Sequence, residues 1–98
     1  MQLPGYTYIL ASKKRGTLYI GVTSALVSRV WKHKQSLVEG FSKERIIYRL
    51  VCYEQYNGIY DANVREKQLK KWNRASRIRL IEKANSNWYD LYNQLTGS

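Results

Sequence analysis

The sequence predicts an α+β fold built on a small three-stranded antiparallel sheet flanked by helices. Two β-rich segments lie close together near the N-terminus, a third apolar run lies mid-chain, and the other segments carry apolar residues at helical spacing. The chain has 98 residues, of which 44% are hydrophobic. Because this is enough apolar material for one compact core, we expect a single domain over residues 1–98.

The N-terminal part is expected to form a hairpin followed by a helix. Residues 6–11 and 17–22 are rich in β-branched and aromatic side chains, which favour strands. The connection between them is short, basic and contains a glycine, as in a hairpin loop. Thr23 and Ser24 offer a helix N-cap, and the apolar stripe behind them predicts a helix over residues 25–37.

Turns separate the elements expected in the rest of the chain. Gly40 is expected to end the first helix, and Asn57 and Gly58 mark a later turn. The predicted elements are a strand over residues 46–53, helices from residue 60 or 61 to 72 and over 76–84, and a short C-terminal helix over 88–95. The core of the domain therefore spans about residues 5–84.

The charge of the chain indicates its partner. Lys and Arg number 17, Asp and Glu number 7, and the formal net charge is +10. So large a positive charge on a short chain points to a polyanion. We favour nucleic acid as the partner. Binding to an anionic membrane surface is a further hypothesis, and it rests on charge alone.

Cysteine and histidine each occur once. A single cysteine excludes an internal disulfide, and the N-terminus has no secretion-signal pattern. No stretch approaches the roughly 20 apolar residues of a membrane span. We therefore expect a soluble, cytoplasmic protein. A closed zinc site of thiolates and imidazoles is excluded as well, so any metal ion must be bound by oxygen ligands.

Two polar residues fall at the apolar stripe of the first predicted helix. His33 lies between Val30 and Leu37 in that stripe, and Arg29 lies one helical turn before His33 at its edge. Both side chains are therefore expected to point toward the sheet. A single histidine in such a stripe is commonly a core imidazole with one satisfied hydrogen bond. Beside an arginine, it is also what a phosphate-handling site needs: a bidentate donor and a group that moves protons near neutral pH.

A carboxylate falls on the apolar face of the next predicted helix. Glu66 shares that face with Ala62 and Leu69, whereas lysines cluster on another face. Turning a carboxylate toward the core costs several kcal/mol unless it is paired or bound to a cation. Glu66 is therefore expected either to form a structural ion pair with Arg29 or Arg65, or to ligate a hard metal ion.

Tyr8 and Tyr19 lie in the middle of the two predicted hairpin strands. Each has an apolar ring and a hydroxyl that needs a partner when buried, so packing is the ordinary role. A phenol near an arginine and a metal ion can instead have a lowered pKa and act as a general base. Both roles stay open for each tyrosine.

These residues occur in the order of a known signature. Tyr19, Ile20 and Gly21 form the second half of the signature of the GIY-YIG nuclease superfamily, which this chain resembles over nearly its whole length. Tyr8 matches the tyrosine of the first half, although Tyr-Thr precedes it in place of Gly-Ile. The family's arginine, histidine and glutamate are matched by Arg29, His33 and Glu66. The segments over residues 18–24 and 65–74 resemble the small, stand-alone bacterial-type branch.

The resemblance implies a GIY-YIG endonuclease fold and a metal-dependent hydrolysis of phosphodiester bonds in DNA. Glu66 would hold one divalent cation, Mg²⁺ or Mn²⁺, and no small-molecule cofactor is implied. Arg29 would bind a non-bridging phosphate oxygen. Tyr8 or Tyr19 would orient or deprotonate the attacking water, with His33 as proton acceptor or orienting partner. A role in DNA repair or recombination is expected. The alternative is a catalytically inactive nucleic-acid-binding module on the same scaffold.

Other basic residues are candidates for contacts with phosphates, which would make binding salt-dependent and largely blind to sequence. They are Lys13, Lys14, Arg15, Lys32, Lys34, Lys67, Lys70, Lys71 and Arg74. Single-stranded DNA, branched DNA and duplex ends remain open as substrates. Many family members also use an asparagine to support the site, and Asn73, Asn85 and Asn87 are available without a spacing that selects one.

Overall fold

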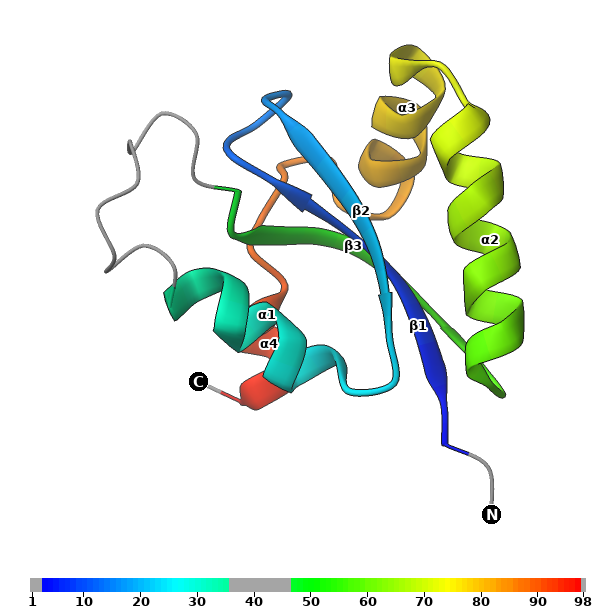
Figure 1. Cartoon of the computed structure of the whole chain (residues 1–98). Helices are drawn as coiled ribbons and strands as arrows, with labels where there is room; N and C mark the ends of the chain where they lie inside the picture. The colour runs from blue at the N-terminus through cyan, green and yellow to red at the C-terminus, as the bar shows by residue number, and fades with distance from the viewer. Residues whose placement is uncertain (1–2, 36–46, 98) are drawn as a thin grey trace.

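A computed structural model describes residues 3–35 and 47–97. Its elements in chain order are β1 (Gly5–Ala11), β2 (Leu18–Thr23), α1 (Leu26–Gln35), β3 (Arg49–Tyr56), α2 (Ile59–Lys71), α3 (Arg74–Ala84) and α4 (Tyr92–Thr96) (Figure 1). The three strands form one antiparallel sheet in the order β2-β1-β3. The predicted sheet and its flanking helices are confirmed. The predicted helix end at Leu37, the break at Gly40 and the strand start at Ile46 lie outside the described residues.

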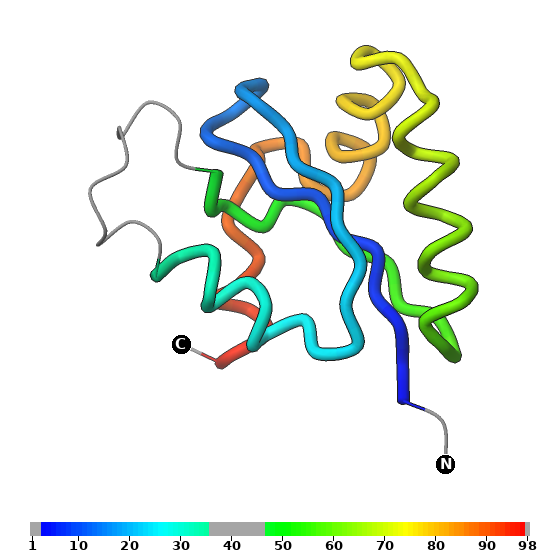
Figure 2. Tube along the Cα trace, viewed as in Figure 1, coloured from blue at the N-terminus to red at the C-terminus, as the bar shows by residue number. Residues whose placement is uncertain are grey.

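Side chains alternate along β1 and so build a core on each face of the sheet. Tyr8 and Leu10 pack with buried residues of α1 and β3 on one face. Ile9 and Ala11 pack on the other face with Leu69 of α2 and with buried residues of β3 and α3. As a result α1 and α2 lie on opposite sides of the sheet (Figure 2).

Three of the predicted element boundaries are wrong by a few residues for local reasons. β3 starts at Arg49, because its pairing with β1 ends there opposite Ala11, and residues 47 and 48 lie outside the strand. β3 runs on to Tyr56, three residues past the predicted end, because it pairs with the full length of β1. α3 starts at Arg74 and not at residue 76, because Asn73 caps it: the Asn73 side chain accepts a hydrogen bond from the Ser76 amide at 2.8 Å.

The predicted C-terminal helix over residues 88–95 is wrong in its first half. The helix α4 starts only at Tyr92. Trp88 has a left-handed backbone (φ 58°), which interrupts a helix. Downstream, the Leu91 amide donates to the Leu50 carbonyl at 2.7 Å, so this stretch of chain runs beside β3 and does not coil on itself.

The hairpin loop is tied to α3 by a carboxylate with three donors. Arg15 donates through Nε and Nη2 to the two oxygens of Glu82, each at 3.0 Å, and Trp88 Nε1 donates to Glu82 Oε2 at 2.7 Å. These bonds favour the ionised carboxylate and hold the pKa of Glu82 at about 2, below its ordinary 4.5. Glu82 therefore makes folding dependent on pH in the acid range.

Because the pKa of Glu82 is lower in the folded chain than in the unfolded one, its stabilising effect is complete above about pH 4.5 and is lost as pH falls toward about 2. We expect Glu82→Gln to lower the free energy of unfolding above pH 4.5 and to approach the wild type near pH 2. Denaturant unfolding across this range measures the difference. An offset that does not change with pH would contradict the assignment.

Candidate active site

The hairpin places two phenols side by side over a glycine. Tyr8 of β1 pairs with Gly21 of β2, and Tyr19 lies two residues before Gly21 on the same face of the strand. The ring centroids of Tyr8 and Tyr19 are 6.2 Å apart. A Cβ at position 21 would lie 2.5 Å from Tyr8 Oη and 3.0 Å from Tyr19 Cε1. Only glycine at this position lets the two rings lie where they do.

The helix α1 brings an imidazole to the same place. Leu26 and Val30 anchor the helix in the core beside Tyr8. The His33 ring lies 5.2 Å from the Tyr19 ring and 6.2 Å from the Tyr8 ring, measured between centroids. His33 Nε2 is 3.4 Å from Tyr8 Oη, the length of a weak hydrogen bond. The prediction that His33 points toward the sheet is therefore confirmed.

Arg29 lies at the edge of this group. Arg29 is exposed. Its charge nevertheless acts on the site, because it lowers the pKa of both Tyr8 and His33. Arg29 is thus close enough to interact with the buried groups and open enough to meet a ligand from solvent.

Glu66 reaches the site from α2. Its neighbours on the same helix face, Ala62 and Leu69, are buried, and the Glu66 side chain itself is only 19% exposed. Its negative charge raises the pKa of Tyr8, as expected of a carboxylate near that phenol. Among the ion pairs of the described residues, that of Glu66 is with Lys70 (Oε2 to Nζ, 3.3 Å) and not with Arg29 or Arg65.

Arg65, the other predicted partner of Glu66, is engaged elsewhere. Its Nε and Nη2 donate to the two carboxylate oxygens of Glu54 at 2.8 and 3.2 Å. Its guanidinium also lies over the Trp72 ring, 5.0 Å from the centroid. Arg65 therefore forms the structural ion pair of α2 with Glu54 of β3 and is not the partner of Glu66.

Protonation distinguishes the roles of the buried groups. Burial, followed by the effects of Tyr19, raises the pKa of Tyr8 to about 12, against a smaller opposing effect of Arg29. Burial and then Arg29 lower the pKa of His33 below its ordinary 6.5. At neutral pH both are uncharged. Arg29 alone does not give Tyr8 the lowered pKa that was one of the two roles left open for it, because the cost of burying a phenolate outweighs the attraction of one cation.

The profile of the GIY-YIG catalytic domain matches residues 4–79. The chain belongs to the GIY-YIG family. A curated relative, a UPF0213 protein of Pediococcus pentosaceus, is 29% identical over 86 residues, covering 85% of this chain and 90% of that protein. The solution NMR structure of a UPF0213 protein from Bacillus halodurans has the same fold, with a TM-score of 0.56 and 23% identity over 92% of this chain and 95% of that one.

Proteins of the GIY-YIG family are generally nucleases that act on DNA with a divalent metal ion. The donor groups at this GIY-YIG site fit a divalent metal ion that is held by one carboxylate and keeps most of its water. Residues 3–35 and 47–97 contain no cluster of three or more His, Cys, Asp or Glu side chains. Mg²⁺ commonly binds through one carboxylate and keeps several waters. Glu66 can therefore hold a largely hydrated Mg²⁺, whereas an all-protein cage is not offered by these segments.

The structure divides the basic residues proposed for phosphate contacts into two groups. Four make bonds within the fold: Arg15 with Glu82, Lys34 with Asp90, Lys70 with Glu66, and Arg74 with the carbonyls of residues 15 and 16. The other five are Lys13, Lys14, Lys32, Lys67 and Lys71, and these are exposed, as are Arg15, Lys70 and Arg74 of the first group. In the segments described, no helix is long and apolar enough to cross a membrane.

Two features of this GIY-YIG site were not predicted from the sequence. Gly21 was noted only as part of the signature, and its steric role under Tyr8 depends on the register of β1 and β2. The asparagines were left unassigned: Asn73 caps α3, and the buried Asn85 donates to the carbonyls of Val51 and Tyr89. Both asparagines therefore have structural partners other than Tyr8 and Tyr19.

Proposed function

We propose that this protein is a metal-dependent endonuclease that hydrolyses phosphodiester bonds in DNA at the site formed by Tyr8, Tyr19, Arg29, His33 and Glu66. The observation that supports it most is the mutual proximity of two phenols, a neutral imidazole, a guanidinium and a carboxylate from four separate elements. Packing alone gives no reason to gather these groups at one partly open place.

Arg29 and Glu66 bind the two charged participants of the reaction. Arg29 is exposed and donates to a non-bridging oxygen of the scissile phosphate, where negative charge grows in the transition state. Glu66 holds the cation by its carboxylate. When bound, this ion supplies positive charge at the departing oxygen.

The two tyrosines differ in their access to water. Tyr19 is 41% exposed and Tyr8 is 1% exposed, and their ring centroids are 6.2 Å apart. The proton of the attacking water passes to Tyr19 Oη, from Tyr19 to Tyr8 Oη, and from Tyr8 to Nε2 of the neutral His33. Each phenol gives up one proton as it receives another, so neither has to exist as a phenolate. The water oxygen then bonds to phosphorus as the bond to the departing oxygen breaks.

A catalytically inactive nucleic-acid-binding module is the second candidate. The ion pair between Glu66 and Lys70 favours it, because an ammonium at 3.3 Å occupies the carboxylate on which the metal depends. If the protein is such a module, loss of the Glu66 carboxylate should change none of its activities. If it is an endonuclease, the same change should abolish cleavage and leave DNA binding intact.

The relay is tested by removing one hydroxyl at a time. We expect Tyr19→Phe and Tyr8→Phe each to slow cleavage by about 10²- to 10⁴-fold, since each breaks the same path for the proton. Cleavage is measured on single-stranded, branched and duplex DNA in Mg²⁺ or Mn²⁺ at several salt concentrations. Tyr60→Phe is the matched control, because Tyr60 is 76% exposed at the start of α2. Absence of cleavage of every DNA form by the wild type would overturn the proposed function.

A further inference from the structure

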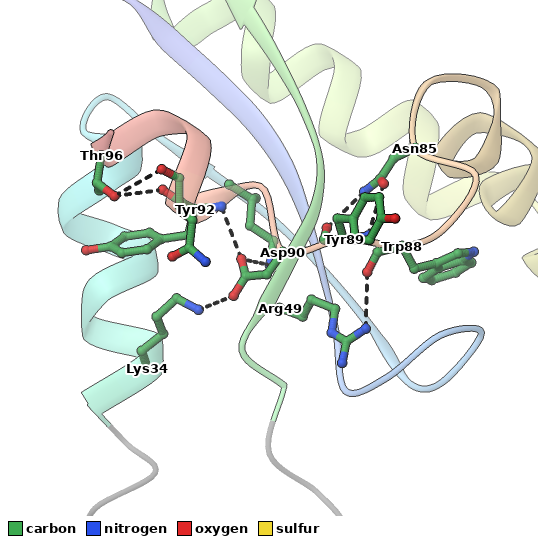
Figure 3. Close-up of polar contacts among 10 residues, drawn as sticks. Lys34, Arg49, Asn85, Trp88, Tyr89, Asp90, Tyr92 and Thr96 are labelled. Atoms are coloured by element: carbon green, nitrogen blue, oxygen red, sulfur yellow. Dashed lines mark hydrogen bonds and ion pairs between the residues drawn. The ribbon is translucent and has the colours of Figure 1, made fainter. Parts of the chain in front are cut away.

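A segment beyond the matched GIY-YIG domain runs beside β3. Residues 88–92 follow α3, outside the matched residues 4–79. The Trp88 carbonyl accepts a hydrogen bond from Arg49 Nη1 at 3.1 Å (Figure 3). The Leu91 amide donates to the Leu50 carbonyl at 2.7 Å. These bonds fix the segment to the start of β3 before it enters α4.

Asp90 in this segment joins three parts of the fold. Its Oδ1 accepts hydrogen bonds from the amides of Leu50 at 3.2 Å and of Tyr92 at 3.1 Å. Its Oδ2 accepts from Nζ of Lys34, which projects from α1 (Figure 3). Both oxygens are thus used, one for the sheet and the C-terminal segment and the other for the helix.

Lys34 is enclosed on more than one side. Its ammonium lies 5.1 Å from the ring centroid of Tyr48 and 5.0 Å from that of Tyr92, both within the range of cation–π attraction. The side chains of Lys34 and Asp90 are only 20% and 21% exposed. A pair this shielded is screened by salt less than a surface pair and holds its geometry more tightly.

The position of Lys34 in α1 gives the pair its importance. The buried residues of the helix, Leu26 and Val30, lie in its first half. Lys34 follows His33 directly in the last turn, where no described residue is buried. The first half of α1 is therefore held by the core, and the turn that carries His33 is held by the bond from Lys34 to Asp90.

We propose that the Lys34–Asp90 pair is a positioning device, which holds the last turn of α1 so that His33 meets Tyr8 and Tyr19. The hydrogen bond that it protects is already long, at 3.4 Å between Tyr8 Oη and His33 Nε2. A small outward movement of this turn would break that bond and expose the imidazole. The effect on cleavage rests on the proposed function, whereas the effect on His33 does not.

His33 is the only histidine of the chain, so its imidazole protons can be followed by ¹H NMR without assignment. The variants are Lys34→Met, which removes the ammonium but keeps a long side chain, and Asp90→Asn, which keeps an oxygen acceptor for the two amides. Release of His33 into water should raise its titration midpoint toward 6.5 in both variants, because burial is the main cause of the lowered pKa. Lys34→Arg, which keeps the positive charge, should leave the His33 midpoint close to the wild-type value.

The two variants separate position from charge. If the two side chains acted on His33 only through their charges, loss of the Lys34 cation would raise the titration midpoint of His33 and loss of the Asp90 anion would lower it. Midpoints that move in opposite directions, or do not move, would overturn the proposal. Glu82→Gln is the control: it breaks an ion pair on Arg15 in the hairpin loop and should destabilise the fold without shifting His33.

Cleavage provides the second measurement. If the endonuclease is real, Lys34→Met and Asp90→Asn should lower kcat by at least about tenfold with a smaller change in KM, because misplacing a reacting group by about 1 Å can cost about 10²-fold. A wild type that cleaves no DNA would refute the function but leave the His33 titration to decide the positioning role. A midpoint shift in both variants with unchanged kcat would limit the role to the fold.

Discussion

Replacing Glu66 with glutamine should abolish DNA cleavage, with a loss of at least about 10²- to 10³-fold in kcat, while binding of DNA is retained. Glutamine keeps the size and shape of the side chain but cannot hold a divalent cation with a charged oxygen. Because Glu66 is 19% exposed and lies on a buried helix face, the neutral amide should be tolerated by the fold. Cleavage is followed over a Mg²⁺ series, and binding by the fluorescence anisotropy of a labelled oligonucleotide.

A matched carboxylate separates this effect from general destabilisation. Glu54 is 26% exposed and bonds Arg65, so Glu54→Gln removes a carboxylate of similar exposure that belongs to the structural ion pair of α2. We expect Glu54→Gln to lower the melting temperature yet keep Mg²⁺-dependent cleavage in the folded protein. We also expect Mg²⁺ to raise the melting temperature of the wild type and to leave that of Glu66→Gln unchanged. Equal loss of activity in both variants would argue that Glu66 is structural.

Helical spacing was enough to predict part of the site. The stripe that contains Val30 placed His33 toward the sheet, and the face that contains Ala62 placed Glu66 toward the core. Both predictions depend only on the period of a helix and on which of its residues are apolar. The same period also brings Lys70 next to Glu66, four residues later, although only Arg29 and Arg65 were considered as partners. The bond of Arg65 to Glu54 of β3 could not be obtained from helical spacing, because it joins two elements.

What the sequence could not give depended on contacts between distant segments. The sequence left packing and a lowered pKa both open for Tyr8. Burial raises the pKa of Tyr8, and the depth of burial is a property of the assembled sheet. Residues 88–91 carry an apolar pattern suited to a helix, but Asp90 binds the amide of Leu50, which is far away in the chain. The same carboxylate binds Lys34, which was expected to contact phosphates and is held inside the fold.

Gly21→Ala is expected to impair the site through a single methyl group. Its Cβ would lie 2.5 Å from Tyr8 Oη and 2.6 Å from Tyr8 Cζ, distances that real side chains do not tolerate. Tyr8 is 1% exposed and enclosed by the core, so relief of the clash has to displace either the Tyr8 ring or β2, and either movement changes the distance from Tyr8 to His33 or to Tyr19. Overpacking of this kind costs about 1–3 kcal/mol. We expect cleavage to fall by about 10²-fold or more, because the path from Tyr19 through Tyr8 to His33 is broken.

The effect is separated from ordinary overpacking by a second glycine of the same hairpin. A Cβ at Gly16 would meet the Ser12 Oγ at 2.4 Å and the Lys13 Cγ at 2.8 Å, both in the loop and away from the tyrosines. Gly16→Ala should therefore lower the melting temperature and leave kcat of the folded protein near the wild-type value. In Gly21→Ala, the His33 resonance should shift together with the loss of kcat. Retention of kcat and of the His33 resonance in Gly21→Ala would mean that the contact of Tyr8 with His33 is not needed for cleavage.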